Sequence, residues 1–429
     1  MSRRGAVRGL TLRGHSLLAA GASAAACGLA LGQRDLLRVG VLLVVLPLAA
    51  LLVAARSRSR LRVARTATPE RVHAGGSTRV RLELVNTASV TTGAVLAQDR
   101  CPAALGTAPR FALERLPAGA RSAVAYTLRP GVRGRHRLGP LQVRVGDPFG
   151  LCEVPGDVGA EQPLLVLPHV EALAPLAGDP GWAGAGEAAR RALVSAGDRD
   201  VTTREYRSGD DLRRVHWRSS ARRGELMVRQ DEQPRSRRAT VLLDRREQAH
   251  CGHGPDSSFE WAVSAAASVA VLLSSAGYGV RVVSGTAAEG AAGGGAGSGA
   301  GWQVHRAASA ADLLDALAVV GTGPAEVLAA AAGAVGPTTG ESLVVAVLGQ
   351  VDGADVAPLA PLPGRGVRGL AVLADTGTWP GRPAARHRDP RAEASRARSA
   401  LAAGGWSVVP ATYGEPVARV WRSLLEGRA

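Results

Sequence analysis

Lysine is absent from this 429-residue sequence, so all 52 basic residues are arginine. Without lysine there is no Gly-x-x-x-x-Gly-Lys-Ser/Thr motif, which excludes ATP hydrolysis of the phosphate-loop type. Cysteine is scarce: the four cysteines form no Cys-x-x-Cys pair, which excludes a disulfide framework and argues against a structural zinc site. No Gly-x-Ser-x-Gly elbow stands at a strand-to-helix turn. We therefore expect a protein without a catalytic site.

What the chain has instead is positive charge and length. The 52 basic and 36 acidic residues give a net charge of +16, and 429 residues predict two or three domains. A charge of this size invites a nucleic-acid interpretation. Much of it lies in the first 65 residues, where eleven arginines stand against one acid, Asp35.

Two uncharged apolar stretches lie between these arginines and predict a transmembrane hairpin over residues 1–65, with spans at about 16–33 and 38–55. A cleaved signal peptide is the alternative for the first stretch, but a second apolar stretch follows almost at once. Four arginines precede the hairpin, five follow it and two lie in its loop. Because arginine-rich flanks stay inside, we expect a two-helix protein of the cell membrane with a cytoplasmic soluble part.

Residues 66–155 predict a small all-β domain of the sandwich type. Runs such as Arg79–Val85 alternate charged and apolar residues with a period of two. Glycine and proline interrupt these runs at short intervals, as turns do. Nothing in this region points to catalysis.

Two long motifs stand out. One combines Arg-Gly-x-x-x-x-Gly-Pro at residues 133–140 with Asp-Pro-Phe-Gly-Leu at residues 147–151. The other lies within residues 199–238, where twelve arginines and seven acids alternate, so that much of the charge can pair internally. This second run is either a solvated, self-paired surface or a docking surface. Its distinctive residues are Arg204, Tyr206, Gly209, Asp210, Arg213, Trp217, Ser220, Ala221 and Arg222.

Both motifs resemble those of the family called domain of unknown function 58, and the second matches its pattern position by position. The resemblance implies a membrane-anchored protein with a C-terminal domain similar to a von Willebrand factor A domain. It also implies a partnership with a MoxR-type AAA+ ATPase, in an assembly role at the cell envelope. The signature residues would then form a docking or bracing surface.

The pattern after the signature agrees with a doubly wound α/β fold, so we assign residues 190–429 to the signature and this domain. Strands expected at 239–243, 279–283, 342–348, 367–373 and 406–409 alternate with helices. The helices are expected at 259–275, 311–320, 324–335, 391–403 and 416–425. The glycine-rich run at 285–301 is expected to be a flexible loop.

A metal site is the main chemical question. In many von Willebrand factor A domains, an Asp-x-Ser-x-Ser loop after the first strand holds Mg²⁺. Here Asp244 is retained, but Arg246 and Gln248 replace both hydroxyls, and arginine repels a cation. Asp352 and Asp375 follow later strands and would add carboxylates. We therefore expect no cofactor, with Mg²⁺ at Asp244 as the alternative.

The histidines give weaker indications of a metal site. The run His250-Cys251-Gly252-His253 contains metal-ligand residue types, but its spacing matches no standard zinc pattern. His136 and His216 lie within arginine-rich runs, and we interpret both as structural.

Three functional hypotheses follow from these observations. The first is a non-enzymatic cytoplasmic adaptor, anchored in the membrane and working with a MoxR-type ATPase. The second is a metal-dependent ligand-binding module that uses Asp244. The third is nucleic-acid binding through the arginine-rich segment, which we do not expect because acids are interleaved with the arginines and aromatic residues are few.

Overall fold

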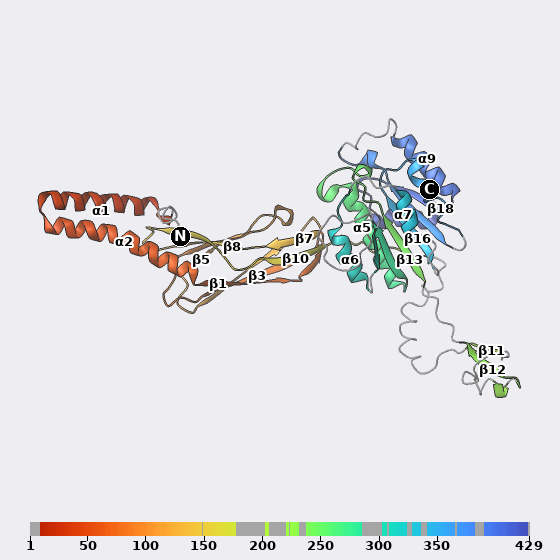
Figure 1. The fold of residues 1–429 in the computed structure, drawn as a ribbon, viewed down its shortest axis with the longest axis horizontal. Helices are drawn as coiled ribbons and strands as arrows, with labels where there is room; N and C mark the ends of the chain where they lie inside the picture. The colour runs from red at the N-terminus through yellow and green to blue at the C-terminus, as the bar shows by residue number, and fades with distance from the viewer. Residues whose placement is uncertain are drawn as a thin grey trace. The chain divides into compact units, whose positions relative to one another are not determined.

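The computed structural model describes residues 9–147, 149–176, 202–205, 220–222, 224–230, 237–284, 303–306, 309–323, 328–335, 341–364, 367–381 and 390–427. The chain divides into two compact units, Met1–Leu167 and Pro168–Ala429, shown in Figure 1. Of the expected features, the glycine-rich run at 285–301 lies outside the described residues.

The first unit begins with two antiparallel helices, α1 (Leu12–Leu31) and α2 (Arg34–Ser59), which lie side by side in Figure 1. Thr11 caps α1, and Gly32 ends it at φ +66°. Small residues let the helices approach closely: a Cβ on Gly40 would lie 2.5 Å from the backbone nitrogen of Ala25. α1 begins before the span expected at about 16–33 and ends shortly before its end, whereas α2 extends beyond the span expected at about 38–55 at both ends.

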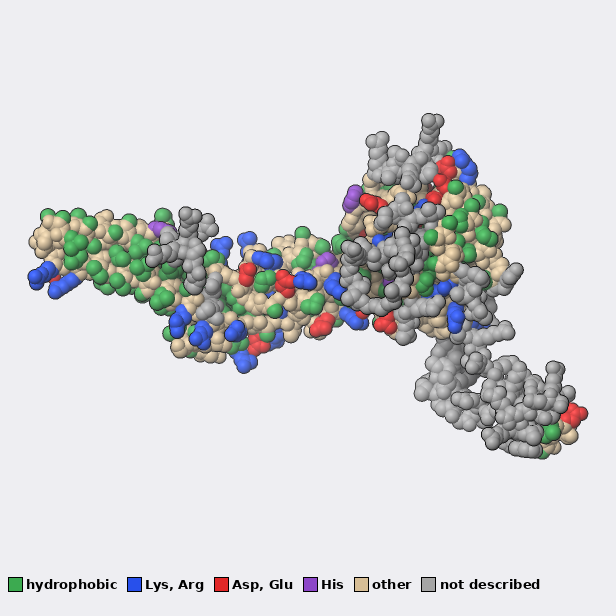
Figure 2. Space-filling model, in the orientation of Figure 1, with side chains coloured by type: hydrophobic (Ala, Val, Ile, Leu, Met, Phe, Trp, Pro, Cys, Tyr) green, Lys and Arg blue, Asp and Glu red, His purple; other side chains and the backbone are tan. Residues whose placement is uncertain are grey.

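These two helices are long and apolar enough to cross a membrane, with mean hydropathies of 1.4 and 2.7. Their large side chains point outward; Leu42, for example, is 63% exposed. In Figure 2 hydrophobic side chains cover the sides of the hairpin, and basic side chains lie at its tip. A third helix, α5 (Ser258–Ser275), meets the same criteria, but 72% of its apolar window is buried inside the second unit.

Ten short strands form most of the rest of the described part of the first unit, as the alternating pattern predicted. β3, for example, alternates buried and more exposed residues along its length. Three sheets result: β1-β3-β6, β5-β4-β8-β9 and β2-β10-β7. The bounds are β1 (Leu61–Thr68), β2 (Arg71–His73), β3 (Thr78–Asn86), β4 (Val95–Asp99), β5 (Arg110–Leu113), β6 (Arg121–Leu128), β7 (Gly134–Leu138), β8 (Leu141–Gly146), β9 (Glu153–Val158) and β10 (Gln162–Leu167).

Two apolar clusters pack the first of these sheets against the other two. Leu82 and Leu84 of β3 meet Val95 of β4 and Val143 of β8 in one cluster. Val80 of β3 meets residues of β7 and β10 in the other. The β region is therefore a two-layer sandwich, and β10 carries it to Leu167, beyond the expected end at 155.

One arginine of the membrane flank lies inside this sandwich. The side chain of Arg65 is 3% exposed, and its Nε and Nη2 atoms both donate to the carboxylate of Asp99. A Cβ on Gly139 would lie 2.4 Å from the guanidinium, so the glycine of the Gly-Pro motif leaves room for it. Arg65 therefore holds the sandwich together and is not an exposed charge, unlike the flanking arginine expected from the sequence.

The second unit contains a six-stranded sheet with the order β15-β14-β13-β16-β17-β18. All neighbouring pairs are parallel except β14 and β15, which are antiparallel. The expected strands are confirmed, and the edge strand β15 is an addition. The bounds are β13 (Arg238–Leu243), β14 (Gly279–Ser284), β15 (Gln303–Arg306), β16 (Glu341–Leu348), β17 (Arg368–Ala374) and β18 (Trp406–Ala411).

Helices cover both faces of this sheet, which makes the fold doubly wound. α5 and α10 pack on one face, and α6 contacts α5. α7 and α9 pack on the other face, with α8 between them. The remaining bounds are α6 (Ala310–Val319), α7 (Leu328–Val335), α8 (Gly353–Val356), α9 (Pro390–Ala403) and α10 (Val417–Glu426).

The segment at 168–176 belongs to this second unit and lies along α5 and α10. The carboxylate of Glu171 accepts hydrogen bonds from the backbone nitrogens of Val417 and Ala418, at 3.1 and 3.0 Å. These are free donors at the start of α10, so the carboxylate caps the helix. The structured part of this unit thus begins before residue 190.

Candidate functional site

The polar residues of the second unit gather at the carboxyl edge of its sheet. β13 has β14 on one side and β16 on the other, so the order of the strands reverses at β13. In open α/β sheets, ligands bind beyond the carboxyl ends of the strands at such a reversal. Asp244 follows β13, Gly349 and Gln350 follow β16, and Asp375 follows β17.

Asp244 is fully buried there and pairs with Arg246. The Nε atom of Arg246 lies 3.0 Å from Oδ1 of Asp244, and its Nη2 atom lies 3.0 Å from Oδ2. The backbone nitrogens of Arg246 and Gly349 donate to the same two oxygens, at 3.1 and 3.3 Å. Four donors therefore satisfy this carboxylate without any ligand.

The same guanidinium reaches a second carboxylate. Its Nη1 atom lies 2.8 Å from Oδ1 of Asp355, which also forms a capping box with Asp352 at the start of α8. Burial by itself would lower the pKa of Arg246, but the carboxylates of Asp244 and Asp355 outweigh burial and raise it. Arg246 thus stays charged and bridges the loops that follow β13 and β16.

His250 supports the loop that follows β13. Its Nε2 atom lies 2.8 Å from the carbonyl oxygen of Asp244, so Nε2 carries the proton and donates. Its Nδ1 atom lies 3.2 Å from the hydroxyl of Ser258. Burial lowers the pKa of His250, and the nearby Arg246 adds to this, although Asp244 acts in the opposite direction. The imidazole is therefore a neutral structural brace.

The geometry fits a metal ion poorly. Both oxygens of Asp244 already accept bonds from Arg246, whose positive charge lies where a cation would have to bind. Both ring nitrogens of His250 have partners, so this histidine offers no free ligand. Within the part of the chain that the structure describes, no cluster of three His, Cys, Asp or Glu side chains has metal-binding geometry.

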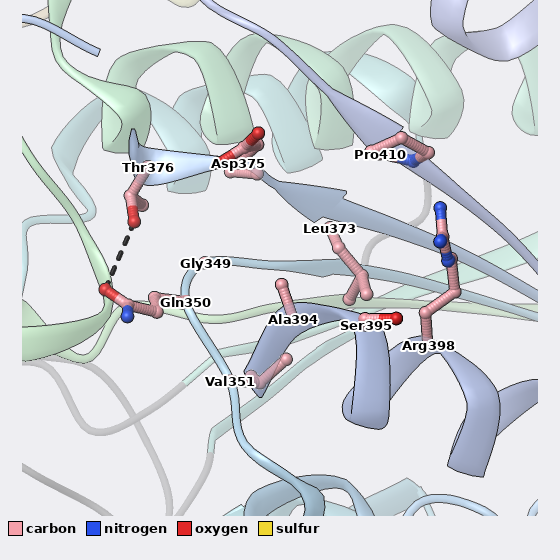
Figure 3. Close-up of a pocket in the computed structure, with 11 residues that line it drawn as sticks. Gly349, Gln350, Val351, Leu373, Asp375, Thr376, Ala394, Ser395, Arg398 and Pro410 are labelled. Atoms are coloured by element: carbon pink, nitrogen blue, oxygen red, sulfur yellow. Dashed lines mark hydrogen bonds between the residues drawn. The ribbon is translucent and has the colours of Figure 1, made fainter. Parts of the chain in front are cut away.

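A pocket of about 190 Å³ opens beside this edge, between the ends of β16 and β17 and helix α9. Figure 3 shows Leu373 and Ala394 lining it, with Arg398 at one side. Thr376 donates a hydrogen bond of 3.1 Å to the side chain of Gln350 at the opposite side. An apolar lining with a polar rim is typical of ligand pockets, although this volume suits only a small group.

The structure describes part of the signature. Arg204 lies in β11 (Thr202–Glu205), paired with Val228 of β12 (Met227–Gln230). Ser220 and Arg222 lie in one helical turn, which the backbone bond from Gly224 to Ser220 closes at 2.9 Å. The remaining signature residues lie outside the described residues: Tyr206, Gly209, Asp210, Arg213 and Trp217.

Sequence reasoning identified Asp244 but missed the partners that occupy it. The sequence indicates Arg246 only as a source of repulsion for a metal, and nothing in it points to Asp355. The one available signal was an arginine two residues after the aspartate, which can fold back onto it. Asp355 is 109 residues from Arg246, so only the fold brings the two together.

The fold defines a protein with two helices apolar enough to span a membrane, followed by a β sandwich and a doubly wound α/β region. Residues 202–311 match the family model described as "Protein of unknown function DUF58". A curated relative, "Uncharacterized protein YeaD" of Bacillus subtilis (strain 168), is 28% identical over 163 residues. This match covers 37% of this chain and 38% of the relative, so the chain spans well under half of the relative's length.

Solved structures add little. The CARDB domain of the PF1109 protein from Pyrococcus furiosus, in complex with di-metal ions, is 14% identical, with 23% of this chain and 85% of that chain covered. The Pseudomonas fluorescens alkylpurine DNA glycosylase AlkC, bound to DNA, is 15% identical, with 30% and 39% covered. Both have a TM-score of 0.17, so neither carries an argument about fold or function.

The buried ion pair generates a stability prediction. Arg246→Ala leaves the carboxylate of Asp244 buried without its counter-charge, which should lower the free energy of unfolding of the second unit by about 3–5 kcal/mol. All seven tryptophans lie in this unit, so their fluorescence during chemical unfolding measures it. Arg396→Ala is the matched control, because Arg396 is 67% exposed in its pair with Glu393 and should cost only about 0–1 kcal/mol. Equal losses of unfolding free energy in the two variants would contradict the assignment of Arg246 as the counter-charge of buried Asp244.

The neutral imidazole of His250 generates a pH prediction. An unfolded histidine binds a proton near pH 6.5, whereas the folded pKa of His250 is lower. Stability from this group is therefore complete above about pH 6.5 and is lost as the pH falls toward the folded pKa. Comparing Tm at about pH 7.5 and about pH 5.5, we expect a smaller loss in His250→Gln than in the wild type. His253→Gln changes an exposed side chain and should leave the loss unchanged; an unchanged loss in His250→Gln would refute this role.

Proposed function

We propose that this chain is a membrane-anchored, non-enzymatic adaptor, whose cytoplasmic part docks a MoxR-type AAA+ ATPase in envelope-associated assembly. The observation that carries the proposal is the combination of an apolar N-terminal hairpin with an α/β unit whose polar edge is closed by its own ion pair. Asp244 and Arg246 satisfy each other, which suits a rigid scaffold better than a reaction centre.

The membrane half of the proposal rests on the two N-terminal helices. Their outward leucines suit contact with lipid, for example Leu29 at 70% exposed and Leu52 at 68%. Arginines precede and follow the hairpin, while Arg38 at the start of α2 forms a 2.9 Å ion pair with Asp35. This distribution supports an orientation with both ends of the hairpin in the cytoplasm.

The docking half rests on the fold and on the family resemblance. Strand order in the second unit, with β15 antiparallel at the edge, is compatible with a von Willebrand factor A-like domain. The class of partner comes from the resemblance of the signature at 204–222. We take that segment as the docking surface, with the pocket beside Gln350 and Arg398 as a second point of contact.

Two alternatives remain distinct proposals. A metal-dependent module would use Asp244, and calorimetry with Mg²⁺ should then show binding that Asp244→Ala abolishes. We expect no binding, because Arg246 occupies both oxygens. A nucleic-acid-binding protein would bind DNA with a steep dependence on salt concentration.

The orientation can be tested by protease protection. The cells are stripped of the layers outside the cell membrane, while the membrane itself stays closed. Externally added protease should leave the soluble part uncut while the membrane is closed, and should digest it once the membrane is opened. Digestion before opening would place the soluble part outside and contradict the adaptor proposal as stated.

Partner docking can be tested by co-elution of the full-length protein, in lipid nanodiscs, with an AAA+ ATPase encoded beside it. We expect association that depends on nucleotide and weakens about tenfold or more in Trp217→Ala, because buried tryptophans dominate many interfaces. Arg62→Ala in β1 is the control, since its exposed side chain lies outside the signature. No association with or without nucleotide would remove the ATPase from the proposal.

A further inference from the structure

We propose that the first unit rests directly on the membrane surface through the loop that contains Asp147 and residues 149–152, with Phe149 inserted among the lipid headgroups. This loop carries the Asp-Pro-Phe-Gly-Leu motif, for which the adaptor function has no role. The inference rests on the proposal that α1 and α2 cross the membrane, and it adds a second, peripheral contact to that anchor.

The loop is tied to the beginning of α1. The backbone nitrogen of Thr11 donates to the carbonyl of Leu151 at 3.0 Å, and its hydroxyl donates to the carbonyl of Gly150 at 2.7 Å. Leu10 forms a strand-like bridge with Cys152. A Cβ on Gly14 would lie 2.1 Å from the carbonyl oxygen of Leu151, so the helix and the loop are in close contact. The loop therefore lies level with the first turn of the first span.

Internal hydrogen bonds keep Phe149 facing outward. The carboxylate of Asp147 accepts from the backbone nitrogens of Phe149 and Cys152, at 2.9 and 2.7 Å. Gly150 turns the chain at φ +69° and bonds back to the carbonyl of Asp147 at 3.2 Å. Phe149 is 65% exposed as a result. Removing a phenylalanine side chain from water is favourable, and this exposed position does not gain that free energy in water.

The surroundings of Phe149 match a lipid headgroup layer. Arg13 is exposed, and its Nη1 atom lies 3.8 Å from where a Cβ on Gly150 would be. Arg60, which follows α2 at the same end of the hairpin, is also exposed. Leu12, directly after the tethered Thr11, is 87% exposed, so the apolar surface of the span begins beside the loop. An aromatic ring and arginines at the end of a span are typical of the interface with anionic lipid.

The contact can be tested with the full chain in nanodiscs that contain anionic lipid, using a photoreactive phenylalanine analogue at three positions. Phe149 is the test position, and Leu42, within α2, reports the span itself. Ser77 is the control because it is exposed and directly precedes β3. The start of β3 pairs with the end of β1 that lies farthest from α2. The length of β1, about 26 Å, therefore separates Ser77 from the end of α2. We expect lipid adducts at 149 and 42, several times more than at 77, with the Tm of the wild type retained.

Each outcome separates the two proposals. Adducts at 42 but none above the Ser77 level at 149 overturn the surface contact and leave the anchor intact. No adducts at 42 overturn membrane crossing itself. If replacing the anionic lipid by zwitterionic lipid leaves the yield at 149 unchanged, Phe149 makes the contact alone and the part assigned to Arg13 and Arg60 is wrong. Lower yield in zwitterionic lipid supports the complete proposal.

Discussion

The arginine–aspartate fork is the interaction on which both units depend. Arg246 donates two bonds to Asp244 at the edge of the α/β sheet, and Arg65 donates two bonds to Asp99 inside the β sandwich. Both pairs use Nε and Nη2 on the two oxygens of one carboxylate, a planar geometry that the ammonium group of lysine cannot form. In a chain without lysine, arginine thus serves as an internal cation as well as a surface charge.

This constraint shapes the candidate site. The buried carboxylate of Asp244 and the partly exposed carboxylate of Asp355 would repel each other, and burial of Asp244 costs its hydration. The guanidinium of Arg246 lies between Asp244 and Asp355 and compensates both, so it joins the loop after β13 to the one after β16. A position where many α/β proteins bind a ligand is here filled by a side chain of the same chain. This arrangement supports the proposed scaffold role.

Periodic segments were predictable and isolated contacts were not. The strand at 239–243 and the helix at 259–275 were found within one residue of β13 and α5, because a buried core demands continuous apolar runs. The short strand β15, the helix α8 and the bond between Arg246 and Asp355 carry no such pattern. The sequence places Arg65 among the arginines that flank the hairpin, yet its side chain lies inside the sandwich.

The sequence by itself determined the apolar hairpin, the alternation of strands in the middle of the chain, and the α/β alternation that follows, since each depends on local periodicity. Only the tertiary structure decided which charges are paired. The fold pairs Asp244 with Arg246 and brings Asp355, 109 residues from Arg246 in the chain, to the same guanidinium. It also set Phe149 beside the first turn of α1. Such contacts join residues distant in the chain, and their energies depend on burial, which composition and spacing do not record.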